Sequence, residues 1–262
     1  MKNKNLIFAI GNSLAVIFTI IVNALANILP INNKYTGDLS DAIPNLFVPS
    51  GLTFAIWGVI YVLLIVFMIY QLNAVFKKEK TDFIEKISIY FMLASLANIV
   101  WIFLWHYEQV VLSLLPMLLL FFSLLMIYQR LEIGLNKTAL KEKLAMQVPI
   151  SVYIGWITVA TIANVTGALV KLQVGDLLLG ESIWTILVIA VATLITILII
   201  LRRKDFAYSL VVVWAFLGII LKRIENDPIY GVQTNIAIFA ALGIVLIFFT
   251  MGITFLLKHK KK

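Results

Sequence analysis

The sequence predicts an all-α protein, a polytopic bundle of about eight transmembrane helices, and three observations lead to this fold class. Hydrophobic residues make up 62% of the 262 residues, and only 13% are charged, whereas roughly a quarter are charged in soluble domains. The mean hydropathy is +1.03. The apolar residues also gather in stretches of the length that crosses the ~30 Å core of a bilayer. The predicted spans are residues 6–29, 51–76, 87–106, 109–128, 147–170, 182–201, 207–222 and 235–257.

The basic residues predict how these spans are oriented. With the amino terminus inside, 17 of the 21 Lys and Arg residues fall in inner segments, which agrees with the positive-inside rule. We therefore expect a multi-pass protein of the cell membrane with both termini cytoplasmic. The net charge of +8 then reflects topology and contact with anionic lipid, and nucleic acid is not an expected partner.

The first span and the loop after it each allow two interpretations. Lys2 and Lys4 before an apolar run resemble a signal peptide, but the run is longer than a typical signal core. We expect the span to be retained, with cleavage as the alternative. The outer loop then carries an apolar tip, Leu46, Phe47 and Val48. The tip either anchors the loop in the membrane interface or forms a lid over a pocket.

The second span begins with a pattern that is typical of a helix. Pro49 suits the first helical turn, because its missing N–H has no partner there. Phe54, Trp57, Gly58 and Tyr61 follow at spacings of three and four residues, so they share one face. Such a face either packs against other helices or forms the wall of a ligand pocket.

The third span carries a buried amide among aromatic residues. Asn98, Trp101 and Trp105 share one helical face. An unpaired amide in hydrocarbon costs several kcal/mol, so Asn98 is expected to bond another helix or a bound molecule. Trp105 and His106 are assigned to the aromatic belt at the membrane interface. The fourth span follows a tight turn and should pack antiparallel to the third.

The fifth span repeats this pattern, and the last three do not. It begins at Pro149, and the residues that share its inward face are Tyr153, Trp156, Ala160 and Asn164. The last three spans contain Trp184 and Trp214 but no polar constellation.

These three stretches together resemble the TspO/MBR family, the tryptophan-rich sensory or translocator proteins. Residues 49–61 are similar to its second-helix signature, although this stretch is one residue shorter and lacks the internal proline. Residues 96–104 resemble the third-helix signature, and residues 153–164 the fifth. The resemblance covers residues 1–170, which we interpret as a five-helix ligand-binding bundle. Residues 171–262 are then a three-helix transmembrane extension.

The resemblance implies a pocket for porphyrins and other flat apolar ligands, used for sensing, regulation or transport. The ligand-binding residues that it implies are Trp57, Tyr61, Asn98, Trp101, Tyr153, Trp156, Ala160 and Asn164. A tetrapyrrole would be the ligand, and no resident cofactor is expected. Sterol binding is not expected, because no Tyr-containing cholesterol motif follows the fifth span. The expected partners are the bilayer and an apolar small molecule, and a homodimer stays open.

Two other classes of function are less well supported by the residues. A multi-pass permease with no tetrapyrrole role is the alternative, but no charged residue lies in mid-membrane, where coupling relays need one. An enzyme is not expected, because no nucleophile–base pair is recognisable and His106 with Glu108 is interpreted as a solvated face. With no cysteine and two histidines, a metal site is not expected either.

Overall fold

The computed structural model describes residues 2–29, 31–43, 45–77, 79–174, 180–225 and 231–259, and in these residues the protein is all-helical. Its elements are α1 (Lys2–Ile28), η1 (Ile31–Asn33), α2 (Thr36–Asp41), η2 (Gly51–Ala55), α3 (Ile56–Phe76), α4 (Asp82–Ile87), α5 (Tyr90–His106), α6 (Leu114–Arg130), α7 (Leu140–Glu142), η3 (Lys143–Gln147), α8 (Val148–Lys171), α9 (Glu181–Arg203), α10 (Phe206–Ile224) and α11 (Thr234–His259).

Six helical segments in the described ranges are long and apolar enough to cross a membrane. They are Lys4–Ala26, Gly51–Phe76, Leu140–Lys171, Glu181–Arg203, Phe206–Ile224 and Thr234–Leu257. The remaining two predicted spans correspond to α5 and α6, which are apolar but have 17 residues each. That length rises about 25 Å, less than the ~30 Å core. Multi-pass membrane character is therefore supported, and eight complete spans stay a prediction.

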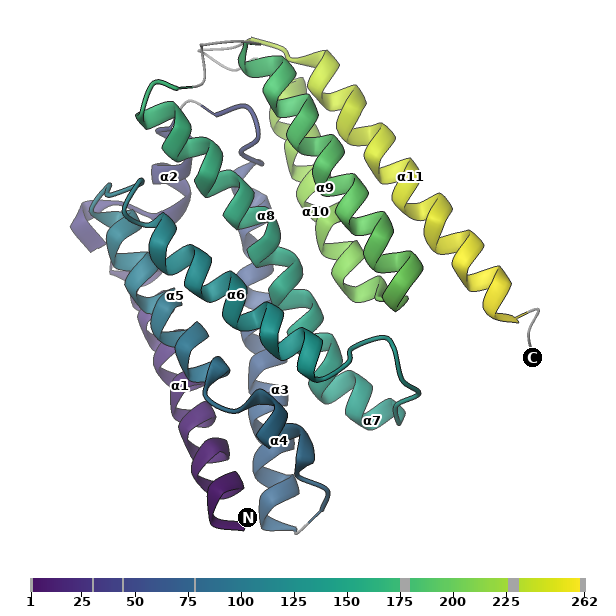
Figure 1. Ribbon diagram of the computed structural model, residues 1–262. Helices are drawn as coiled ribbons and strands as arrows, with labels where there is room; N and C mark the ends of the chain where they lie inside the picture. Colours follow the sequence, from purple (N-terminus) through teal and green to yellow (C-terminus); the bar gives the residue numbers. More distant parts are fainter. Residues whose placement is uncertain are drawn as a thin grey trace.

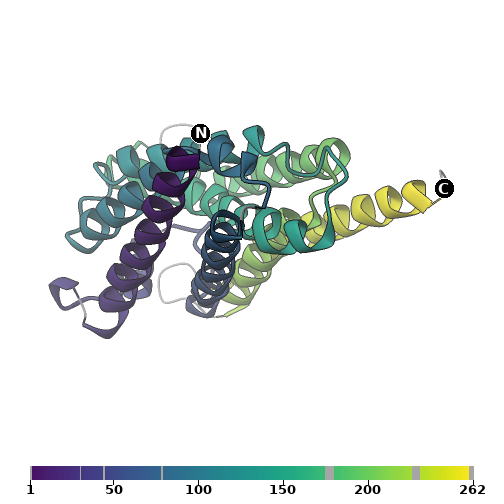
Figure 2. The ribbon, with the colours of Figure 1, turned by 90° about the horizontal axis from the view of Figure 1, so that it is seen from below.

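The long helices run up and down, and the two ends of the chain lie at the same end of the molecule (Figure 1). Helices α1, α3, α5, α6 and α8 pack together, and α9, α10 and α11 lie beside them as a second group. Seen along the bundle, α11 is the outermost element of this second group (Figure 2). Helix α10 makes the main contact between the groups, because it packs against α8.

Two glycines allow α10 to approach the first group closely. A Cβ on Gly155 of α8 would lie 3.2 Å from the carbonyl oxygen of Tyr208. A Cβ on Gly218 of α10 would lie 1.9 Å from Thr53 Oγ1, so no side chain fits there. The Gly218 carbonyl also accepts from the amide of Ser50 at 3.0 Å. Helix α10 is thereby joined to the start of the second span.

The opposite end of α10 is fixed by a buried carboxylate. Asp205 is buried, and its Oδ1 accepts from the backbone amide of Tyr208 at 3.2 Å, which caps the first turn of α10. Its Oδ2 accepts from the hydroxyl of Tyr128 on α6 at 2.8 Å. The guanidinium of Arg203 lies over the Tyr128 ring and donates to the Ile133 carbonyl at 3.1 Å. These contacts bind the turn between α9 and α10 to α6.

Three helix boundaries differ from the sequence prediction. The third span begins at Tyr90 instead of residue 87, because a separate short helix, α4, ends just before Ser88, whose φ of 53° lies outside the helical region. The second span starts with a 3-10 turn, η2, before α3. Pro149 lies in the first turn of α8 as expected, but the π-helix η3 and α7 extend this span back to Leu140. The inner loop before the fifth span is therefore shorter than predicted.

Candidate functional site

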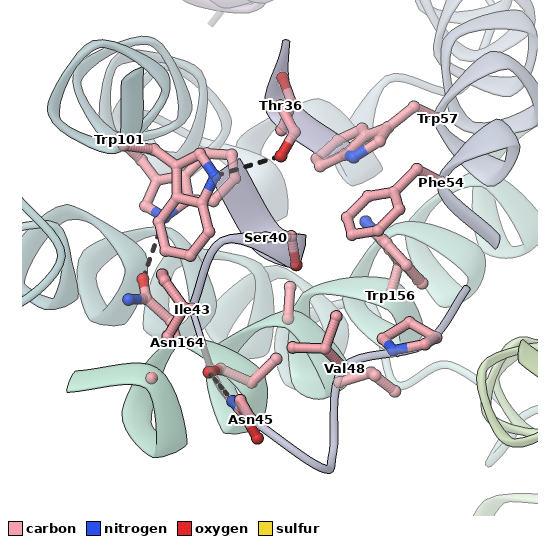
Figure 3. Close-up of a pocket in the computed structure, with 16 residues that line it drawn as sticks. Thr36, Ser40, Ile43, Asn45, Val48, Phe54, Trp57, Trp101, Trp156 and Asn164 are labelled. Atoms are coloured by element: carbon pink, nitrogen blue, oxygen red, sulfur yellow. Dashed lines mark hydrogen bonds between the residues drawn. The ribbon is translucent and has the colours of Figure 1, made fainter. Parts of the chain in front are cut away.

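A pocket lies between α3, α5 and α8 at the end of the bundle away from the start of α1, beneath the loop that precedes η2 (Figure 1 and Figure 3). Its empty volume is about 600 Å³, a figure that includes open solvent at its mouth. The lining residues are Thr36, Ser40, Ile43, Asn45, Val48, Pro49, Phe54, Trp57, Trp101, Trp105, Trp156, Val159, Ala160, Ala163, Asn164 and Gly167.

One wall of the pocket consists of two stacked indoles from α5. The rings of Trp101 and Trp105 are 5.5 Å apart and inclined by 22°. Their spacing of four residues places them one above the other on the same helical face. The indole nitrogen of Trp101 donates to Asn164 Oδ1 at 3.0 Å. The indole nitrogen of Trp105 points at the carbonyl of Thr36 at 3.4 Å.

The opposite wall is built from aromatic rings that meet edge to face. Trp156 of α8 packs against Phe54 at 5.9 Å and Trp57 at 6.3 Å. Trp57 is also stacked on Tyr61 at 5.7 Å. Figure 3 shows Trp57, Phe54 and Trp156 on the side of the pocket that faces Trp101. Trp156 is buried, and its indole nitrogen has no hydrogen-bond partner in the protein.

Asn164 joins three helices at one side of the pocket. Its Oδ1 accepts from Trp101, and its Nδ2 donates to the Val110 carbonyl at 3.3 Å and to Ser113 Oγ at 3.0 Å. Val110 and Ser113 belong to the turn between α5 and α6. Both polar atoms of the Asn164 side chain are therefore engaged by the protein, so this residue holds the Trp101 ring in place and is not a free ligand donor.

Small residues on α8 make the hollow. Trp156, Ala160, Ala163 and Gly167 follow one another at four, three and four residues, so they share the helical face toward the pocket. Ala160, Ala163 and Gly167 carry side chains no larger than a methyl group, and Val159 and Asn164 line the pocket beside them. The space that larger residues would fill is thereby left between α8 and the two aromatic walls.

The loop between α1 and η2 covers the pocket, and we name its described residues, 31–43 and 45–50, the cover. Six of the lining residues belong to the cover. Asn45 fastens it to α8, since its Nδ2 donates to Thr166 Oγ1 at 2.7 Å and its Oδ1 accepts from the Phe47 amide at 3.0 Å. Leu46, Phe47 and Val48 are all buried in the protein. Anchoring in the membrane interface is therefore not their role.

A second, smaller hollow next to the pocket carries charge. It is lined by Trp105 and Ile43, which it shares with the pocket, and by Glu108 and Lys171, among others. Lys34 of the cover forms an ion pair with Glu108 in the turn after α5. The hydrogen bond from Lys34, and its positive charge, hold the pKa of Glu108 below its usual value. The pocket is thus apolar within and charged at its outer margin.

The structure brings most of the predicted site residues together. Trp57, Trp101, Trp156, Ala160 and Asn164 line the pocket, and so does Val48 of the predicted lid. Three other predicted site residues lie one layer behind the walls of the pocket. Tyr61 stacks behind Trp57, Tyr153 packs against the same ring at 6.1 Å, and the fully buried Asn98 accepts from Asn23 of α1 at 2.7 Å.

Two assignments from the sequence are wrong. Trp105 and His106 are not belt residues at the interface. Trp105 lines the pocket, and His106 is fully buried, with its Nδ1 2.7 Å from the Ile102 carbonyl and its Nε2 3.4 Å from Thr36 Oγ1. The solvated face proposed for His106 and Glu108 therefore contains Glu108 alone. The shared helical face of Trp101 and Trp105 was the signal that could have placed Trp105 correctly.

Comparison with known families places this chain beside a described family. A family model described as TSPO-like protein matches residues 8–253. The match continues through most of the predicted three-helix extension, beyond the 170 residues that carry the motif resemblance. No curated protein and no solved structure matches the chain. The division of the chain at residue 170, and the likeness of the first five helices to the five-helix bundle, stay predictions.

We predict that Asn164→Ala lowers the free energy of unfolding by about 1–3 kcal/mol, because it leaves buried hydrogen-bonding groups without partners. Thermal unfolding in detergent measures the change. Thr161→Ala on the same helix is the matched control, because Thr161 bonds only within its own helix, to the Ile157 carbonyl. Equal stability of the two variants would contradict the role of Asn164 as the link between α5, α6 and α8.

Proposed function

This chain belongs to the TSPO-like protein family, and from that premise we propose that it binds a flat, largely apolar small molecule of porphyrin-like shape in the pocket beneath the cover. It would act as a sensor, regulator or carrier of that ligand. The single observation that carries the proposal is the facing arrangement of Trp101 and Trp105 on one side and Trp57 and Trp156 on the other. Aromatic walls favour a ligand with a π face.

The chemistry of the pocket supports binding as its role. Its lining is mostly apolar, with the hydroxyl groups of Thr36 and Ser40 and the amides of Asn45 and Asn164 as polar features. Few polar groups in an apolar hollow fix the orientation of a ligand. Acidic groups at the edge of a ligand would meet Lys34 and Lys171 beside the pocket.

We predict saturable quenching of tryptophan fluorescence when protoporphyrin is titrated into the purified protein, and no saturable quenching with cholesterol. Trp101→Phe should weaken protoporphyrin binding roughly five- to tenfold, which corresponds to about 1–1.5 kcal/mol for a lost stacking contact. Ala163→Leu should abolish binding, because the larger side chain fills the hollow.

Trp184→Phe is the matched control, because Trp184 lies on α9 and is exposed on the outer surface. Trp214 is less suitable, since its indole nitrogen donates to the Thr53 carbonyl at 2.9 Å, beside the pocket. Unchanged affinity in both Trp101→Phe and Ala163→Leu, with the fold intact, would mean that the aromatic residues are only packing.

We further propose that the cover acts as a lid. Its apolar residues Leu46, Phe47 and Val48 pack inward, and a ligand has to displace the cover to enter the space beneath it. We predict that hydrogen exchange across residues 40–50 slows when protoporphyrin is bound, because the ligand adds contacts that opening must break. Unchanged exchange at saturating protoporphyrin would make the cover a fixed wall.

We also propose that both termini are cytoplasmic and that α5 and α6 cross the membrane as a short pair. Because the chain has no cysteine, single cysteines report their side of the membrane directly. We predict that Lys80→Cys and Lys141→Cys are labelled from the cytoplasmic side and Gln109→Cys from the outside. Labelling of all three from one side would show that α5 and α6 do not cross.

A further inference from the structure

The face that α1 buries is unusual for a membrane helix, because it contains amides and small residues and no large apolar side chain. Its buried residues are Asn5, Ala9, Asn12, Ser13, Val16, Thr19, Asn23 and Ala26. The large apolar residues of the same helix, such as Ile7, Leu14 and Phe18, are on the outer surface. Small residues are common where membrane helices meet, but a row of amides needs a further explanation.

Each amide on this face is paired with a neighbouring element at a different depth. Asn5 Nδ2 donates to Thr81 Oγ1 at 2.9 Å, close to the inner end of the bundle. Asn12 Nδ2 donates to Gln71 Oε1 of α3 at 3.2 Å. Asn23 Nδ2 donates to Asn98 Oδ1 of α5 at 2.7 Å.

We name these residues and Thr19 the polar seam. From Asn5 to Asn23 the helix rises about 27 Å, so the polar seam runs through most of a ~30 Å hydrocarbon core. Helix α1 packs against both α3 and α5 over this length, and Figure 1 shows the three helices together.

The pairing leaves several buried polar atoms of the polar seam without a partner in the protein. They are Asn5 Oδ1, Asn12 Oδ1, Thr19 Oγ1 and Gln71 Nε2, while Asn98 Nδ2 faces the hydroxyl of Tyr153. Their side chains are all at least nine-tenths buried. Leaving such a group without a hydrogen bond costs about 1–3 kcal/mol. Several such groups together therefore favour a bound molecule that forms hydrogen bonds with them.

The hydrogen-bonding character of these atoms indicates which kind of molecule can bind them. The set contains both acceptors and donors, and no charged side chain belongs to it. An anion would require hydrogen-bond donors around it, and a cation would require acceptors. A neutral molecule that both donates and accepts can bond the donors and the acceptors of this set. Water does so, and buried water typically makes about three such bonds to otherwise unsatisfied groups. The small residues of α1 are compatible with room for it.

We propose that the polar seam binds a row of water molecules that enters from the inner end of the bundle and reaches the layer behind the aromatic walls of the pocket. Its upper end is Asn98, one helical turn from Trp101 of the pocket. The competing interpretation is a dry interface in which the amides only hold the helices together.

Cysteine oxidation separates these interpretations, because the native chain has no thiol. Thr19→Cys places a thiol in the polar seam with little change in volume. Hydrogen peroxide is the probe, since it is neutral and close to water in size. The thiolate, which forms where water is present, attacks the O–O bond of the peroxide and gives a sulfenic acid and hydroxide. Loss of maleimide labelling after unfolding measures the oxidised fraction.

We predict that Thr19→Cys is oxidised at least tenfold faster than two controls. Leu124→Cys lies in the apolar core, and Phe18→Cys faces the outer surface next to the tested position. Ser13→Cys, another close substitution on the buried face of α1, should react like Thr19→Cys and serves if that variant does not fold. Thiols at both positions that react as slowly as Leu124→Cys would overturn the proposal.

A second comparison tests the direction from which water enters. In the Thr19→Cys background, Asn12→Leu with Gln71→Leu replaces both members of the lower amide pair by apolar groups of similar size. Oxidation at position 19 should then fall at least tenfold. An unchanged rate would overturn the inner route. The experiment uses no pocket ligand, so its result is independent of the proposed porphyrin binding.

Discussion

Hydrocarbon offers no hydrogen bonds, so each polar group that this chain carries into a membrane must be satisfied within the protein. Apolar side chains cannot decide which helices become neighbours, because lipid tails are as apolar as they are. The few amides can. Asn164 links α8 to α5 and to the turn before α6, and Asn23 links α1 to α5. The arrangement of the first five long helices follows these bonds.

The same constraint explains why the pocket walls are in defined positions. An indole carries one N–H, and in this interior its bond fixes the direction of the ring. Asn164 fixes Trp101, and the Thr36 carbonyl of the cover fixes Trp105. Trp156 is held by ring contacts alone, and its nitrogen has no partner in the protein. Polar contacts therefore fix the rings of the wall formed by α5, whereas packing alone fixes Trp156.

Much of this architecture could be predicted from the sequence, because hydropathy and helical periodicity act within one helix. They located the helices and placed Trp57, Trp101 and Trp156 on inward faces. They could not give the rotation of one helix against another, and so Tyr61 and Asn98 were expected in the pocket but lie behind its walls. The short helix α4 was also missed, because no Gly or Pro marks its end at Ser88 and only the backbone angle there reveals it.

The contacts of the cover were harder to predict, because a loop has no periodic sequence pattern from which contacts can be inferred. Thr36, Ser40 and Asn45 became candidates only when the structure placed them above the hollow. The outer end of α10 was missed for the same reason. Gly218 carries no side-chain signal, yet its place beside Thr53 and Pro49 leaves no room for a Cβ. A constraint that consists of an absent side chain is visible only in three dimensions.

This contact gives the C-terminal helices a part in the site, although they line none of it. Val48 and Pro49 form part of the pocket lining, and the next residue, Ser50, bonds the Gly218 carbonyl. Gly218 is already in contact with Pro49, so the end of the cover cannot move toward α10 unless α10 moves too. Helix α10 packs in turn against α9 and α11. A ligand that displaces this end of the cover therefore acts on the second group of helices, which the family match includes up to residue 253.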